Sequence, residues 1–298
     1  MNVLNRRVVL VTGKGGVGRT TVAVALARVA AQAGKRVLLA EVGDPEGGYS
    51  PCGRHFGVEH LSEHPRPIGD GVLGAHLWAR AGHESFLSTV LPAPPLVRAA
   101  VRSKSLSKFL IAAPSFHEMG VFYHLLTLLK AQRKDGTPEH ELIVIDMPAT
   151  GHTLALTGLP DILLRLIPRG PIATAMREGQ AFLNHPKSAA AWIVTLPEQL
   201  PVTESLELLD GLRETKVPAG AVVLNRFPRD PFTSEERAAL DAVLHTQPMH
   251  GSMAFHRIAT AAEQLERLRG IDVPIMRLPE VAKPDTDLLE ALRREIAA

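Results

Sequence analysis

Cysteine is the scarcest informative residue in this sequence. Among 298 residues there is one, Cys52. One thiol cannot form a disulfide within a chain, and it also excludes a CxxC redox pair and a cysteine-rich metal knuckle.

Long apolar runs and a surplus of either charge are missing as well. No uninterrupted run of about 18 apolar residues occurs, so we expect no membrane-spanning helix and no stable membrane insertion. Lysine and arginine total 33 against 31 acidic residues, which leaves no basic excess to hold a nucleic-acid backbone. The first residues run straight into an apolar segment, and we expect no signal peptide there. These absences predict a cytoplasmic globular protein that binds no nucleic acid.

Short apolar segments alternate with helical patterns along the chain. Because the segments are continuous and rich in β-branched residues, they are typical of parallel strands buried on both faces. They span residues 8–12, 35–41, 141–146, 190–196, 219–225 and 272–278. The first two flank a glycine-rich loop and an apolar-periodic helix that ends near Gly34, which makes a βαβ unit. The pattern predicts an α/β fold with a doubly wound, mostly parallel sheet.

The remaining segments are less regular. We expect one domain over residues 1–298, with an irregular stretch at 43–83, which is rich in Gly, Pro and His. Helical insertions are predicted at about 84–132 and 155–186, and the helix at 116–132 should face the core. Prolines at 160, 168 and 171 should break the second insertion.

The stretch GKGGVGRTT, residues 13–21, has the G-x-x-x-x-G-[K]-[ST] pattern of a phosphate-binding loop. Such loops need glycine because their N–H groups turn inward around phosphate oxygens, at φ angles that other residues resist. The following helix presents its N-terminal dipole to the anion, and Thr20 is placed to bind Mg²⁺. The loop lies between a buried strand and a helix, so it predicts nucleotide binding.

Arg19 occupies the position at which these loops normally have lysine. A guanidinium keeps the positive charge, but it is wider and planar, whereas an ammonium is a compact point charge. Binding should survive this change. Stabilisation of the transition state depends on placement within fractions of an ångström, so we expect hydrolysis to suffer more than binding.

The longer string and a second motif resemble a known family. With Lys14, the loop is similar to the GKGGVGKT loop of the deviant phosphate-loop ATPases. DMPATGHTL, residues 146–154, resembles the DTAPTGHTL segment of the arsenite-pump ATPase and of the guided-entry ATPase that targets tail-anchored proteins. Further similar stretches are PSFHEM (114–119), VTLPEQLPVTESLELL (194–209), VVLNRF and PIMRLPEV (274–281). The chain thus resembles a bacterial single-unit branch of the arsenite-pump/guided-entry (ArsA/GET) family, a resemblance that is weakest over residues 43–113.

This resemblance implies ATP and Mg²⁺ as ligands and assigns roles to particular residues. Lys14 would reach the phosphates of a partner subunit, Thr20 and Asp146 would hold Mg²⁺, Gly151 would lie near the γ-phosphate, and Asn225 would bond adenine. Alternatives from the residues alone are a solvated surface lysine at 14, a turn-capping aspartate at 146 and an Asn-turn at 225. The full set of implied nucleotide-binding residues is Gly13, Gly15, Gly16, Val17, Gly18, Arg19, Thr20, Thr21, Gly151, Asn225 and Pro279.

The first switch departs from the family pattern. Family members read STDPAH after the second strand, and their aspartate orients the attacking water, whereas this sequence reads LLAEVGDPEGG. Asp44 matches when the shared DP pair is aligned with one extra residue, and Glu41 is a competing candidate. Either residue can be the one that positions water, with Lys14 and Asp146 as the other catalytic candidates.

Two branches of the family are excluded by absent residues. A metalloid pump needs several thiolates, and the eukaryotic targeting ATPase closes its dimer with a zinc held by CxxC motifs. The resemblance therefore implies a dimeric Mg²⁺-dependent ATPase, as a homodimer or as a heterodimer with a paralogous ATPase. A switch-coupled contact surface for a protein client is expected at residues 156–179, where ordinary packing is the alternative. Two other functions stay open: a low-turnover regulatory subunit, and a DNA-binding partition ATPase, which the charge balance disfavours.

Overall fold

The fold is built on one eight-stranded sheet. The computed structural model describes residues 3–43, 47–91, 93, 95, 116–148, 150–244, 250–281 and 284–297. The strand order is β3-β4-β2-β5-β1-β6-β7-β8, and every pair is parallel except the antiparallel edge pair β3–β4. The strands are β1 (Val8–Gly13), β2 (Val37–Val42), β3 (Arg66–Gly69), β4 (Val72–Leu77), β5 (Leu142–Asp146), β6 (Ala189–Thr195), β7 (Ala219–Phe227) and β8 (Ile275–Pro279). The predicted mostly parallel α/β architecture is confirmed.

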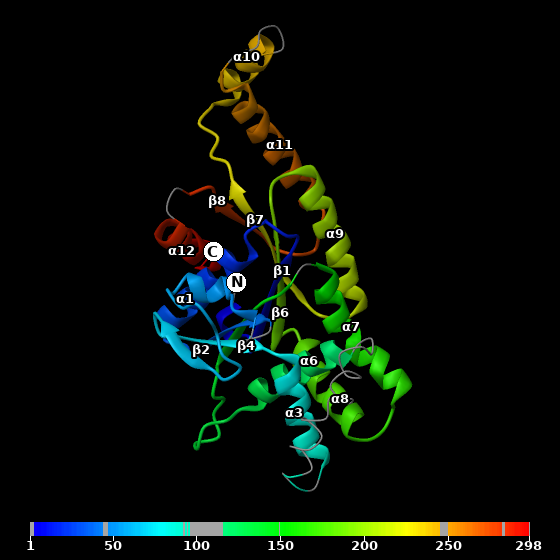
Figure 1. Ribbon diagram of the computed structural model, residues 1–298. Helices are drawn as coiled ribbons and strands as arrows, with labels where there is room; N and C mark the ends of the chain where they lie inside the picture. The colour runs from blue at the N-terminus through cyan, green and yellow to red at the C-terminus, as the bar shows by residue number, and fades with distance from the viewer. Residues whose placement is uncertain are drawn as a thin grey trace.

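Helices cover both faces of this sheet (Figure 1). One face carries α1 (Arg19–Gln32), the short α2 (Pro51–Arg54) and α12 (Pro284–Ala297). The other face carries α3 (Ala79–Val90), α6 (Phe116–Lys130), α7 (Thr150–Leu166), α8 (Pro171–Leu183) and α9 (Gln199–Glu214). Beyond β7, helices α10 (Ser234–Leu244) and α11 (Ser252–Leu268) extend away from the sheet. A 3-10 turn, Val3–Asn5, precedes β1.

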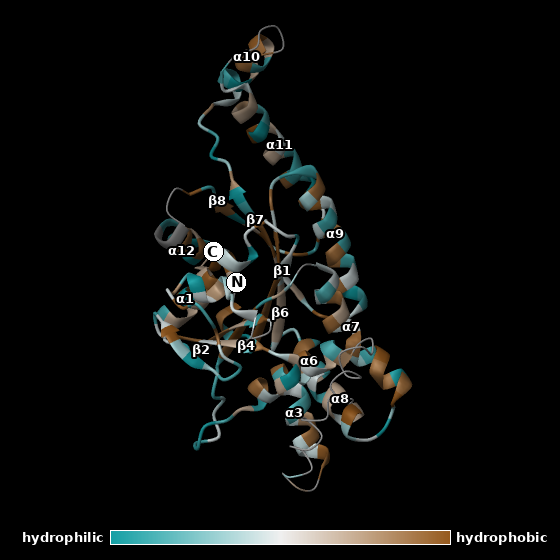
Figure 2. Ribbon diagram, in the orientation of Figure 1, coloured by the Kyte–Doolittle hydropathy of each residue, from teal (hydrophilic) through white to brown (hydrophobic). Residues whose placement is uncertain are grey.

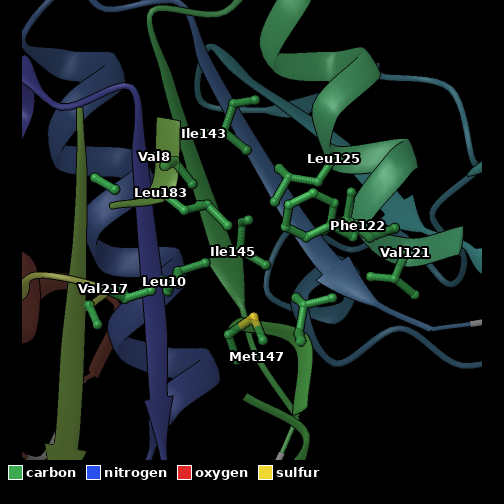
Figure 3. Close-up of a cluster of buried hydrophobic side chains, with 14 of the residues drawn as sticks. Val8, Leu10, Val121, Phe122, Leu125, Ile143, Ile145, Met147, Leu183 and Val217 are labelled. Atoms are coloured by element: carbon green, nitrogen blue, oxygen red, sulfur yellow. The ribbon is translucent and has the colours of Figure 1, made fainter. Parts of the chain in front are cut away.

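The core consists of two apolar layers, one on each face of the sheet. Alternate residues of a strand enter opposite layers, so Val9 and Val11 face α1, while Val8 and Leu10 face α6. Figure 3 shows this second layer, in which Phe122 and Leu125 of α6 lie against the strands. The strands are mostly brown or pale in Figure 2, with a teal end on β7, as expected for a sheet buried on both faces. The prediction that the 116–132 helix faces the core is thereby confirmed.

Two local expectations were wrong. Residues 43–83 are not irregular, because they contain α2, β3 and β4. These strands escaped detection because β3 is only four residues long and starts with Arg-Pro, and β4 carries Gly74 and His76. Nor does Pro160 break the second insertion, since α7 is continuous from Thr150 to Leu166. A proline removes one N–H donor, but α7 buries Pro160 and packs against α6, α8 and α9, which holds the helix together.

Other expected helices agree with the structure. The first insertion contains α3 and α6, although residues 96–115 lie outside the described part. The breaks at Pro168 and Pro171 fall where α7 gives way to α8, and Pro171 is the first residue of α8. Within the described residues, no helix is both long and apolar enough to cross a membrane.

Candidate functional site

The phosphate loop connects the end of β1 to the start of α1. Its glycines adopt the backbone that the sequence pattern required, with φ of 145° at Gly13, 85° at Gly16 and 94° at Gly18. A Cβ on Gly13 would lie 2.1 Å from the carbonyl oxygen of Val194 in β6, so only glycine fits there. The N–H groups of residues 15–18 form no hydrogen bond with any other residue that the structure describes. The loop thus offers free donors beside the N-terminus of α1, which is an anion-binding arrangement.

Asn225 supports this loop from behind. It lies near the end of β7, is 5% exposed, and its Nδ2 donates to the carbonyl oxygen of Val17 at 2.8 Å. The contact is tight, because a Cβ on Gly18 would lie 2.4 Å from the same Nδ2. The structure therefore brings Asn225 to the loop, in a position that the Asn-turn alternative did not anticipate. Pro279 ends β8 and pairs with Phe227 of β7 near the same edge of the site.

Thr20 and Asp146 meet at the foot of the loop. The Thr20 hydroxyl donates to Oδ2 of Asp146 at 2.6 Å, although 126 residues separate them in sequence. Burial raises the pKa of Asp146 above its usual value, while the Thr20 hydrogen bond and the charge of Arg19 oppose that rise. Oδ1 of Asp146 is buried and has no hydrogen-bond partner in the described part of the chain. Thr20 and one open carboxylate oxygen form a hard, oxygen-only ligand set of the type that Mg²⁺ accepts.

Arg19 lies close to Asp146, and part of its guanidinium forms no hydrogen bond with the described residues. It is half-buried, and burial lowers its pKa while the nearby carboxylate of Asp146 opposes the shift. One of its terminal nitrogens is buried without a hydrogen-bond partner among the described residues. A cationic donor left unpaired beside free loop amides fits a phosphate group. The residues present therefore match both Mg²⁺ and a polyphosphate.

Lys14 turns toward a different partner. Its ammonium lies 2.8 Å from Oε1 of Glu204 in α9, and both side chains are about one-third exposed, at 38% and 32%. Within one chain, the ammonium is thus bound to α9. The proposed reach of Lys14 into a second subunit remains a prediction. Sequence reasoning quoted the stretch that contains Glu204 but gave this residue no role.

The second switch lies directly beside the loop strand. The first turn of α7 carries Gly151, which is exposed, and Thr153, which is buried. The Thr153 and Thr12 hydroxyl oxygens are 2.8 Å apart, so a hydrogen bond joins α7 to the end of β1, just before the phosphate loop. Asp146, at the end of β5, is four residues before the start of α7. The DMPATGHTL stretch therefore links the Mg²⁺ candidate to a long helix.

Of the two candidate residues in the first switch, the structure describes only Glu41. Asp44 lies outside the described residues, so its role stays a prediction. Glu41, the competing candidate, is buried at the end of β2 and contacts the Cys52 backbone and the His76 imidazole. Neither His76 nor Cys52 was assigned to the site from sequence. No motif marks either residue, because each reaches the site only through strand register and chain folding.

Comparisons with known proteins identify relatives of this chain. A family model described as anion-transporting ATPase matches residues 6–170, over half of the chain, a range that includes the phosphate loop, Asp146 and α7. ATPase BagA of Mycobacterium tuberculosis is 30% identical over 306 residues, which cover 93% of this chain and 88% of BagA. An uncharacterised protein of Streptomyces coelicolor, SCO2128, is 28% identical over 168 residues, which cover 55% of this chain and 39% of that protein.

Proposed function

The chain belongs to the anion-transporting ATPase family, and from this premise we propose that it is a Mg²⁺-dependent ATPase that works as a dimer. The observation that carries the proposal is the Thr20–Asp146 pair beside the unbonded amides of residues 15–18. A phosphate-binding loop and a magnesium carboxylate meet there at the carboxyl ends of parallel strands, where ligands bind in open α/β sheets.

Each residue of the site has a separate task in this proposal. The loop amides bind the phosphate chain, and the unpaired nitrogen of Arg19 adds a charged donor to it. Thr20 and Asp146 hold Mg²⁺, which neutralises phosphate charge when it is bound. Asn225 keeps the loop in its binding shape through Val17 and would contact adenine when a nucleotide is bound. Residues 13–21 thus fix the substrate before any chemistry takes place.

The same proposal couples nucleotide state to a partner surface. A change at Asp146 reaches α7 within four residues, and α7 is joined to β1 through Thr153. Three exposed apolar side chains lie at the far end of α7 and directly after it, namely Ile162 (50% exposed), Leu166 (72%) and Ile167 (37%). We call these three residues the α7 patch. Exposed apolar groups of this kind are typical of protein contact sites, so the α7 patch is where a protein client would bind.

Dimerisation assigns a role to Lys14. Because Gly15 and Gly16 are exposed next to it, the loop can face a second subunit, and Lys14 would then reach that subunit's phosphates. Its present partner, Glu204, would have to release it. In this proposal the protein acts in the cytoplasm, binds no nucleic acid and does not insert into a membrane.

A second candidate function follows from Arg19. Its wide guanidinium stands where transition-state stabilisation normally needs a compact ammonium, so the chain would bind ATP and hydrolyse it slowly. In that case it acts as a regulatory subunit that pairs with a more active paralogous ATPase. Arg19→Lys would then raise turnover, whereas an unchanged rate would remove this explanation.

Single-turnover hydrolysis tests the proposed function directly. ATP is mixed with excess protein and Mg²⁺, and oligomeric state is measured in the same samples by light scattering. We expect hydrolysis that increases with the dimer fraction and disappears in Asp146→Asn. Tight ATP binding without turnover would favour the regulatory subunit. Absence of ATP binding with and without Mg²⁺ would refute both candidates.

A further inference from the structure

Three buried polar side chains form a row across the carboxyl ends of three neighbouring strands. In the parallel register, Glu41 of β2 pairs with His76 of β4 on one side and with Asp146 of β5 on the other. Residues in register point to the same face of a sheet, here the face covered by α1 and α2. Their exposures are 3% for His76, 4% for Glu41 and 9% for Asp146. Such burial of two carboxylates side by side is costly unless each is held by partners.

Glu41 forms a hydrogen bond through Oε2, whereas Oε1 is buried without a hydrogen-bond partner in the described part of the chain. Oε2 accepts a hydrogen bond from the backbone N–H of Cys52 at 2.9 Å. Oε1 faces Nε2 of His76 at 3.3 Å, which is an ion-pair contact when the imidazole is protonated. Gly43 packs against the opposite edge of that imidazole, since a Cβ there would lie 3.0 Å from Nδ1. Glu41 is therefore clamped between a strand neighbour and α2 and is not open to water.

We call the contacts of Glu41 with His76 and Cys52 the clamp. Cys52 connects the clamp to Asp146. The Cys52 thiol is completely buried and donates to Oδ2 of Asp146 at 3.7 Å, a usual distance for a sulfur donor. Oδ2 also accepts from Thr20 at 2.6 Å. With Oδ2 held from two sides, Oδ1 is left as the open oxygen of the carboxylate. Ser50 caps α2 by accepting from the N–H of Gly53, which keeps Cys52 in place.

We propose that Glu41 and His76 are positioning residues of the magnesium site. They hold α2 against the strand ends, so that Cys52 and Thr20 together fix the Asp146 carboxylate with Oδ1 open for the hydrated metal. This inference rests on the proposed function, because it requires that Asp146 serve Mg²⁺. It also assigns Glu41 a role other than positioning the attacking water, since its carboxylate is buried, with Oε2 bonded to Cys52 and Oε1 facing His76.

Mg²⁺ titration of nucleotide binding tests the clamp without using turnover. The probe is a fluorescent ADP, whose dissociation constant is measured in EDTA and across a range of Mg²⁺ concentrations. Residues that orient a metal ligand typically change metal affinity by about 10- to 100-fold. We expect Glu41→Ala and His76→Ala each to raise the half-saturating Mg²⁺ concentration by about 10-fold or more. The double variant should be no worse than either single one, because the two residues act as one clamp.

His76→Ala separates positioning from simple charge. His76→Ala leaves the Glu41 carboxylate in place. If the Glu41–His76 pair acted only through its charge, Mg²⁺ binding would be unchanged or tighter in this variant. That result would overturn the proposal. His140→Gln is the matched control, because His140 is equally buried, at 2%, just before the opposite end of β5. It should leave the Mg²⁺ dependence unchanged.

Cys52 provides a second test in case His76→Ala fails to fold. Cys52→Ala removes the donor to Asp146 and should weaken Mg²⁺ binding, whereas Cys52→Ser keeps a donor and should restore it. Equal Mg²⁺ dependence of Cys52→Ala and the natural protein would overturn the proposal. If the natural protein bound no nucleotide at all, the proposed function would have failed instead, so the two failures are distinguishable.

Discussion

Replacement of Asn225 by alanine should weaken the protein in two separable ways. The amide Nδ2 donates to the Val17 carbonyl at 2.8 Å, and both residues are buried, at 5% and 1% exposure. Asn225→Ala leaves that carbonyl oxygen without its partner, which costs about 1–3 kcal/mol. The free energy of unfolding should therefore fall by about that amount.

The second effect concerns the base. One of the two Nδ2 hydrogens is committed to Val17, so Oδ1 is the acceptor that Asn225 can offer a nucleotide. It can bond the 6-amino group of adenine, whereas it would face the 6-oxo group of guanine. A hydrogen bond of this kind contributes about 0.5–1.5 kcal/mol. Asn225→Ala should thus reduce the preference for ATP over GTP by about 2- to 13-fold.

Urea unfolding measures the first effect, and competition of ATP and GTP against a fluorescent ADP measures the second. Asn184→Ala, at the C-terminal end of α8, is the control and should change neither. A stability loss with an unchanged ATP preference would limit Asn225 to supporting the loop and would refute its adenine role. Unchanged stability would refute the argument from the Val17 contact.

Three further predictions follow from the same contacts. Gly13→Ala should lower the unfolding temperature strongly, because its Cβ would overlap a β6 carbonyl at 2.1 Å, whereas Gly15→Ala, with nothing within 4 Å, should weaken only nucleotide binding. Burial lowers the pKa of His124 to about 4, so the stability it contributes is complete above its unfolded value of 6.5 and is lost as pH falls toward 4. This loss is about 3 kcal/mol, visible as a pH slope in urea unfolding that His124→Gln removes. Glu204→Gln frees Lys14 from a partly exposed pair that contributes at most about 1 kcal/mol in each subunit, so light scattering with ATP should show homodimers at up to about 30-fold lower protein concentration.

Each of these predictions has an outcome that contradicts it. Equal unfolding temperatures for the two glycine variants would mean that the β6 contact does not constrain the loop. A pH slope that persists in His124→Gln would belong to other groups. Dimer formation that is unchanged in Glu204→Gln but lost in Lys14→Ala would show that Lys14 matters without Glu204 restraining it.

Features that depend on neighbours along the chain could be predicted from the sequence. A loop with glycine at 13, 16 and 18 between a buried strand and a helix needs only local backbone rules to be interpreted, and its positive φ angles followed. Strands on both sides of the loop were found because residues buried on both faces leave continuous apolar runs. The DMPATGHTL stretch identified Asp146 through resemblance, before any contact was known.

Only the tertiary structure decided which distant side chains complete the site. Strand order placed β2 between β4 and β5, and this order alone set His76 and Asp146 on either side of Glu41. Cys52 looked like a lone thiol because its partner is 94 residues away. The strands β3 and β4 were missed because neither is a continuous apolar run, and pairing with neighbouring strands is what makes them strands. Local sequence specifies backbone conformation, whereas the contacts that orient Asp146 depend on which strands become neighbours in the sheet, and residues far apart in the chain decide that order.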